Sequence, residues 1–252
     1  MAISKIRGNF WLQDMKKREY AVGILKTLVI FGLILYLFYE SIFPAPFLLP
    51  IWILYIKDWA EDKARQKEQQ FRSQFRDSIQ ALSAALKAGY SVENAIRETL
   101  KDIRPMYGKD TRIIKEYERM AVRLNMNGTA AQALEEFCER TKQEDVENFV
   151  NVFAASKISG GDSISLIRNA VNTISEKIET EKEIDTLLAS KKMEFEIMCA
   201  VPFIIILYMK MTFGEFLEVL YGNIAGTVTM TICLAVYIGA YRFGRKLIRI
   251  DV

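Results

Sequence analysis

The chain has 252 residues and a formal net charge of +3, so it lacks the strongly basic balance typical of nucleic-acid-binding domains. It contains no histidine, which removes the commonest general base and metal ligand and excludes Ser-His-Asp and Cys-His catalysis. Its three cysteines lie far apart and form no CxxC pair, so they predict no disulfide framework. We expect no catalytic residue, no cofactor, no metal ligand and no nucleic-acid partner.

The amino-terminal end combines a polar segment with a long apolar run. Residues 1–20 mix aromatic and basic side chains, which favours a cytoplasmic interfacial segment over a nucleic-acid-binding arm. Residues 21–39 carry one charge, Lys26, and a helix of this length crosses a hydrocarbon core ~30 Å thick. A cleaved signal peptide would be shorter and would be followed by a small-residue cleavage site. The run therefore predicts a membrane span.

A second apolar stretch, residues 42–56, is uncharged but contains three prolines. A helix from about Pro44 to Trp59 is just long enough to cross the membrane, with the tryptophan at the interface. The alternative is a re-entrant or interfacial segment. We predict the full span, so that residues 21–59 form a transmembrane hairpin.

Residues 60–192 are polar and charged and show no strand-like alternation, which predicts a domain made entirely of helices. Six segments carry apolar stripes at helical spacing; the first contains Phe71, Phe75 and Ile79, and the second is expected to stop at Pro105. The expected segments are about Ala60–Ala88, Ser91–Arg104, Lys109–Met126, Thr129–Thr141, one from near Glu144, and one from Asp162 or Ser163.

Three short motifs join these helices in the same way. In each, glycine ends one helix in a left-handed conformation and a Ser, Thr or Asp caps the next. Thr129 with Gln132 also fits the spacing of a capping box. The predicted corner residues, all structural, are Gly89 and Ser91, then Gly128 and Thr129, then Gly160, Gly161 and Asp162.

The last corner, ISGGDSISLI (158–167), also resembles a glycine-rich phosphate loop. A P-loop, however, needs a preceding strand and a Gly-Lys pair, and neither is present. Asp162 would in addition repel phosphate. We therefore interpret it as a helix corner. The charge run at 176–183, EKIETEKE, is interpreted as a solvated helix face with i,i+4 pairs.

The carboxyl-terminal part predicts a second transmembrane hairpin, residues 193–241. One span contains Pro202, which membrane helices tolerate, and the other is Val219–Tyr241, which carries no charge. No Gly or Pro occurs from Ser163 to Val201, so the sixth helix is expected to continue unbroken toward the Pro202 span. Residues 242–252 form a basic tail, which we expect in the cytoplasm.

Basic residues near the span ends predict the orientation. They flank the amino-terminal segment, the middle region and the tail, whereas the loop 40–45 has none and the loop 210–222 has one. Four spans, with both termini and residues 60–192 in the cytoplasm, agree with the positive-inside rule at every flank. The expected fold is therefore all-α: an integral membrane protein with a six-helix cytoplasmic bundle between two pairs of transmembrane helices.

The chain resembles the type II secretion F-domain family (GspF), and within it the TadB/TadC-like platform proteins of tight-adherence pili. The residues that carry the resemblance are FRDSIQALSAALKAGYSVENAI (75–96), the NGTAAQALEEF corner, NFVNVFAASKISGGDSISLIRNAVNTI (148–174) and the following EIDTLLASKKMEFEIMCAVPF. The resemblance implies an inner-membrane platform that couples a cytoplasmic secretion or pilus assembly ATPase to pilin-like subunits. It also implies a homo-oligomer or a paralogous F-domain partner, since larger members carry two such domains.

Two other functions fit the sequence less well. A small transporter or channel would show inverted membrane repeats and charges inside several spans, whereas here the repeated motifs lie in the polar region. A membrane enzyme or nucleotide-driven motor is disfavoured by the lack of histidine and of a phosphate loop.

Overall fold

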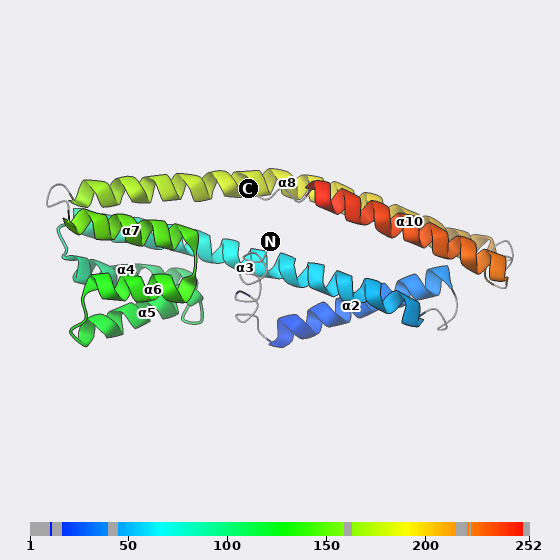
Figure 1. The fold of residues 1–252 in the computed structure, drawn as a ribbon, viewed down its shortest axis with the longest axis horizontal. Helices are drawn as coiled ribbons and strands as arrows, with labels where there is room; N and C mark the ends of the chain where they lie inside the picture. The colour runs from blue at the N-terminus through cyan, green and yellow to red at the C-terminus, as the bar shows by residue number, and fades with distance from the viewer. Residues whose placement is uncertain are drawn as a thin grey trace. The chain divides into compact units, whose positions relative to one another are not determined.

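The computed structural model describes residues 11, 17–39, 45–158, 163–214, 221 and 223–248, and within these ranges it is helical with no strand. The all-α prediction is therefore confirmed for the described residues. The helices drawn in Figure 1 are α2 (Lys17–Phe38), α3 (Ala45–Lys87), α4 (Val92–Tyr107), α5 (Arg112–Asn125), α6 (Ala130–Thr141), α7 (Glu144–Ile158), α8 (Ser163–Thr212) and α10 (Ile224–Ile248).

The chain divides into two compact units. Unit 1 comprises Met1–Lys63 and Glu183–Val252, and unit 2 comprises Ala64–Lys182. Helices α3 and α8 contribute residues to both units, whereas α4 to α7 lie wholly in unit 2. In unit 2, consecutive helices from α4 to α7 contact one another.

An aromatic cluster forms the centre of unit 2. Its ring centroids lie 6.1 to 6.4 Å apart, and Phe75 contacts three of the other rings. The predicted stripe from Phe71 to Leu86 on α3 is buried, which confirms that face. Offset and edge-to-face aromatic contacts of this kind add to the stabilisation from apolar burial. The cluster consists of Phe71, Phe75, Tyr117, Phe137 and Phe149.

Two helix boundaries differ from the sequence expectation. The predicted break between a span ending near Trp59 and a helix starting near Ala60 is absent, because α3 is continuous and has no Gly or Pro after Pro50. The predicted stop at Pro105 is also wrong, since α4 continues to Tyr107. A proline in the last turn removes one hydrogen bond, and the helix ends instead at Gly108, whose φ is +74°.

In unit 1, aromatic side chains fit against glycines on neighbouring helices. Gly23 of α2 lies so close to the Trp59 indole of α3 that a Cβ at this position would overlap the ring. Gly244 of α10 lies in the same way against Phe195 of α8. The small residue allows close approach, which is the usual way that membrane helices pack.

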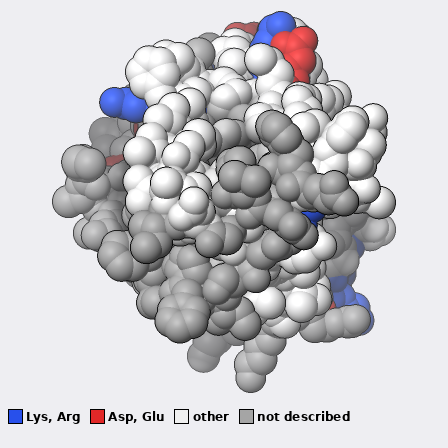
Figure 2. All heavy atoms as spheres, turned by 90° about the vertical axis from the view of Figure 1, so that its right-hand side faces the viewer, with Lys and Arg blue, Asp and Glu red and all other residues white. Residues whose placement is uncertain are grey.

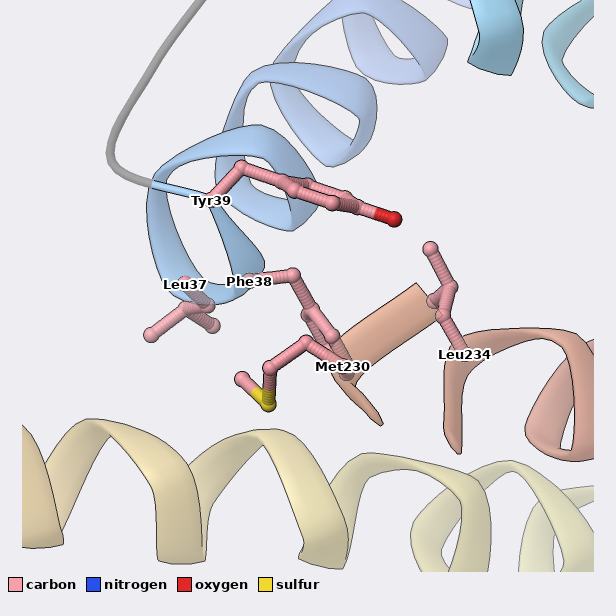
Figure 3. Close-up of a cluster of buried hydrophobic side chains, with 5 residues drawn as sticks. All are labelled: Leu37, Phe38, Tyr39, Met230 and Leu234. Atoms are coloured by element: carbon pink, nitrogen blue, oxygen red, sulfur yellow. The ribbon is translucent and has the colours of Figure 1, made fainter. Parts of the chain in front are cut away.

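The end of α2 packs against α10 in a buried apolar cluster (Figure 3). The Phe38 side chain points toward Met230, and the Tyr39 ring points toward Leu234. The Tyr39 hydroxyl lies 3.0 Å from the Thr231 hydroxyl, which itself donates to the Thr227 carbonyl at 2.7 Å. Because the threonine proton is used in this way, Tyr39 donates to Thr231. The cluster consists of Leu37, Phe38, Tyr39, Met230 and Leu234.

Three of the described helices are long and apolar enough to cross a membrane, over Ala21–Phe38, Ile164–Thr212 and Ala225–Ile248. Figure 2 views unit 1 from the right-hand side of Figure 1, and the described atoms of this face are mostly uncharged. The start of α3 is not among the three, because its first 18 residues include Lys57, Asp58, Glu61 and Asp62. The second span, and hence two transmembrane pairs, stays a prediction.

The aromatic cluster makes a direct prediction about stability. Phe75 is 1% exposed, so Phe75→Ala is expected to lower the free energy of unfolding of unit 2 by about 3–5 kcal/mol. Pulse proteolysis in urea on the detergent-solubilised chain measures this change. Val122→Ala on α5, where the side chain is 57% exposed, is the control and is expected to shift it by less than about 0.5 kcal/mol. Equal effects of the two substitutions would contradict a core centred on Phe75.

Candidate functional site

The first predicted corner joins α3 to α4. Gly89 has φ +88°, and the backbone N–H groups of Gly89 and Tyr90 donate to carbonyls in the last turn of α3. The Ser91 hydroxyl then accepts from the Asn94 N–H at 3.4 Å at the start of α4. The corner thus satisfies backbone groups that the two helix ends leave without helical partners.

The second corner, between α5 and α6, uses its residues differently. Asn127, with φ 62°, takes the left-handed conformation that the sequence analysis assigned to Gly128. Asparagine tolerates this conformation because its short side chain bonds locally. Gly128 is needed for space instead, since a Cβ there would lie 2.8 Å from the Arg123 carbonyl oxygen. Thr129 and Gln132 form a reciprocal capping box with two bonds of 3.2 Å.

These two corners lie at the same end of unit 2, where Arg97 of α4 donates to Asn125 of α5 at 3.0 Å. The third corner is outside the described residues: Gly160, Gly161 and Asp162 fall between the end of α7 and the start of α8. Its role as a helix corner stays a prediction. Neither described corner lines the groove between α6 and α7.

A groove of about 720 Å³ lies between α6 and α7. Three carboxylates line it, from Glu135, Glu139 and Glu147, against one cation, Lys142. Burial raises the pKa of the Cys138 thiol in this groove, and the three carboxylates raise it further. The cysteine is therefore held as a thiol, and the negative lining repels phosphate.

Within the described ranges, no group of three or more His, Cys, Asp or Glu residues is placed to hold a metal ion. The cysteines of α8 and α10, Cys199 and Cys233, are free thiols, as is Cys138. Among the described residues the groove thus offers no metal centre, and its cysteine is not an activated nucleophile.

The most heavily charged cluster of unit 2 is centred on Asp145 of α7, whose side chain is 1% exposed. It accepts from the Arg72 Nε of α3 at 2.6 Å and from the Lys177 Nζ of α8 at 3.1 Å. Arg72 also pairs with Glu181, and Arg76 pairs with Glu179. The network therefore joins α3, α7 and α8 through charge-assisted hydrogen bonds.

The pKa values of the cations reflect these partners. Burial lowers the pKa of Lys177, but Asp145 and Glu144 outweigh burial and the pKa is raised. Burial likewise disfavours the charged form of Arg72, yet Glu181 and Asp145 raise its pKa above the usual value. Both cations are held charged, so the attraction is present throughout the neutral pH range.

Most of residues 176–183 are exposed, as expected for a solvated face, but the stretch also contacts other helices. Lys177, Glu179 and Glu181 make ion pairs to α3 and α7, which the sequence did not predict. The sequence did not indicate the roles of Asp145, Arg72 and Arg76, because Arg72 pairs with Asp145 and Arg76 with Glu179 across 73 and 103 residues of chain. The one available signal was the four-residue spacing of the two arginines.

A second buried carboxylate, Glu116 of α5, was also missed. It accepts from Arg119 at 2.6 Å and from Arg140 of α6 at 2.7 Å, and its side chain is 2% exposed. Arg112 donates to the Arg140 carbonyl at 3.0 Å, which adds a further link between α5 and α6. These contacts fix the two helices that follow one another across the second corner.

Unit 1 has its own charged cluster near the end of α10. The Arg245 guanidinium donates to Asp58 at 3.0 Å and to Asp62 at 2.5 Å, both on α3. Lys192 of α8 lies 3.9 Å from Asp62. Arg245 therefore ties α10 to α3 at the point where the polar part of α3 begins.

Near the end of α8, Lys210 lies between two tyrosines. Its Nζ donates to the Tyr36 carbonyl at 2.9 Å and lies 3.8 Å and 5.1 Å from the ring centroids of Tyr36 and Tyr221. The Tyr221 hydroxyl donates to the Leu37 carbonyl at 2.5 Å. Two carbonyls in the last turn of α2 are thus bonded by side chains.

The Asp145 network predicts a large difference between two adjacent carboxylates. Asp145→Asn is expected to lower the free energy of unfolding by about 3 kcal/mol, because Arg72 and Lys177 lose the buried negative charge with which both of them pair. Glu144→Gln removes the same charge, but the Glu144 carboxylate is 61% exposed in its pair with Lys177. The expected loss of unfolding free energy is therefore less than about 1 kcal/mol. Urea unfolding of the solubilised chain compares the two, and equal losses would show that burial of Asp145 is unimportant.

The family model for type II secretion system (T2SS), protein F, matches residues 78–210, which is more than half of the chain. The matched residues run from the buried face of α3 through α4 to α7 and along α8 to Lys210. No curated protein and no solved structure matches the chain.

Proposed function

The chain belongs to the type II secretion system protein F family, whose members are membrane platform proteins of secretion and pilus systems. From this premise we propose that it is an inner-membrane platform that couples a cytoplasmic assembly ATPase to pilin-like subunits. The observation that carries the proposal is α8, one helix of 50 residues that begins in unit 2 and ends in a segment apolar enough to cross a membrane.

Helix α8 suits this coupling because its two parts have different surroundings. Its first part is bound to α3 and α7 through Lys177, Glu179 and Glu181. Its later part, around Pro202 and Phe203, contacts the aromatic side chains of α2 and α10. In the proposed mechanism, a movement that the ATPase imposes on unit 2 is carried along α8 to the pilin-binding membrane part.

We also propose that the protein is not an enzyme. The acidic groove beside Cys138 favours cations over the phosphates of a nucleotide, and burial disfavours the thiolate form of the cysteine. The ATP hydrolysis that drives assembly is then supplied by the partner. The match at residues 78–210 corresponds to one F domain, and we propose that this domain assembles as a homo-oligomer or with a paralogous F-domain partner.

The proposed topology has both termini and the polar region around unit 2 in the cytoplasm. Single cysteines introduced near Phe43 or Glu218 are therefore expected to react with an impermeant maleimide in intact cells, in a background where the three native cysteines are replaced. Cysteines introduced at Lys63 or at Arg242 are expected to react with the maleimide only after the cells are lysed. Labelling of intact cells at Lys63 would overturn the proposed orientation.

The coupling mechanism is tested by interrupting α8. A Gly-Ser insertion after Ser190 lies outside the ion pairs at Lys177–Glu181, so it is expected to leave unit 2 folded and ATPase binding intact while abolishing pilus or substrate assembly. The matched control is the same insertion after Gly108, in the turn between α4 and α5, where assembly is expected to continue. Normal assembly with the Ser190 insertion would show that α8 transmits nothing.

A further inference from the structure

The last two turns of α10 present three different faces within a few residues. One face packs against α8 and α3. Tyr241 stacks on Phe195 with ring centroids 5.7 Å apart, and Gly244 lies against the same ring. Arg245 binds Asp58 and Asp62. A second face is apolar and exposed, formed by Phe243 at 67% and Leu247 at 64% exposure.

The third face carries two cations, Arg242 and Lys246, which are both exposed. They are four residues apart and so lie one above the other on the helix surface. Within the described part of the chain, neither makes an ion pair or a side-chain hydrogen bond. Arg245 differs from them, since two aspartates neutralise it.

The position of these cations along the helix determines their surroundings. They lie at the end of a segment, Ala225–Ile248, that is apolar enough to cross a membrane, and next to exposed Phe243 and Leu247. Exposed apolar side chains at the end of a span contact lipid, so the neighbouring cations lie where acyl chains give way to headgroups. A cation in hydrocarbon is costly, and its long side chain reaches the phosphate layer instead.

We propose that Arg242 and Lys246 bind the phosphate of an anionic phospholipid, with Phe243 and Leu247 packed against its acyl chains. An anionic lipid is favoured over a zwitterionic one because, among the residues that the structure describes, no carboxylate pairs with either cation, and an anionic lipid places no cationic headgroup beside them. Arg242 supplies a planar guanidinium for two parallel hydrogen bonds, and Lys246 supplies a second positive charge. The Asp58–Arg245–Asp62 contact holds this end of α10 in place.

The test uses the full chain in nanodiscs that contain phosphatidylcholine and phosphatidylglycerol in equal amounts. The lipids that remain bound after transfer to detergent are counted by native mass spectrometry. The wild-type chain is expected to retain phosphatidylglycerol in preference to phosphatidylcholine, and Arg242→Gln with Lys246→Gln is expected to reduce this preference on the order of tenfold. Arg242→Lys with Lys246→Arg, which keeps both charges, is expected to retain most of it.

Lys109→Gln with Lys115→Gln is the matched control, because both are exposed cations in unit 2 and their loss removes the same two charges. It is expected to leave the lipid preference unchanged. If the double variant does not fold, Arg242→Gln alone is used, with a smaller loss expected. A wild-type chain without preference, or a preference that the glutamine variants keep, would overturn the proposal.

A competition arm separates the lipid from its phosphate group. Inorganic phosphate in the millimolar range is expected not to displace phosphatidylglycerol, because the acyl chains contribute contacts with Phe243 and Leu247. Displacement at that concentration would show a site for free phosphate and would also overturn the lipid assignment. None of these measurements depends on pilus or substrate assembly, so their failure is distinct from failure of the platform function.

Discussion

One buried carboxylate, Asp145, holds unit 2 together across segments that are far apart in the sequence. It accepts hydrogen bonds from Arg72 of α3 and Lys177 of α8. These two helices also contribute residues to unit 1. A buried charge is tolerated in a protein interior when it is paired and hydrogen-bonded, and here both conditions hold. The aromatic cluster around Phe75 then supplies apolar burial beside this ionic contact.

Side-chain periodicity predicted the helices of unit 2 well, because each stripe is a local pattern. The buried series on α3 from Phe71 to Leu86 and the capping box of Thr129 and Gln132 both follow from spacings of three or four residues. The sequence did not determine which residue of the second corner is left-handed, because asparagine and glycine both tolerate this conformation. The structure places it at Asn127 rather than at Gly128.

Other features depend on contacts that no short window contains. The charge run 176–183 has the composition of a solvated face, and only the three-dimensional pairing with Arg72 and Arg76 shows its cross-helix role. Composition also suggested a break near Trp59, where apolar residues give way to charged ones. A change in polarity alters the surroundings that a helix faces but does not by itself end the helix, so α3, which has no Gly or Pro after Pro50, continues through the change.

The carbonyls at the end of α2 are bonded by Lys210 and Tyr221 rather than left for water. A spanning helix ordinarily needs its final turn in the headgroup region, where water satisfies those groups. Here two of these carbonyls are bonded from within the protein, at the end of a helix of 22 residues with a length of ~33 Å. This last turn of α2 therefore depends less on water than a helix end without such side chains would.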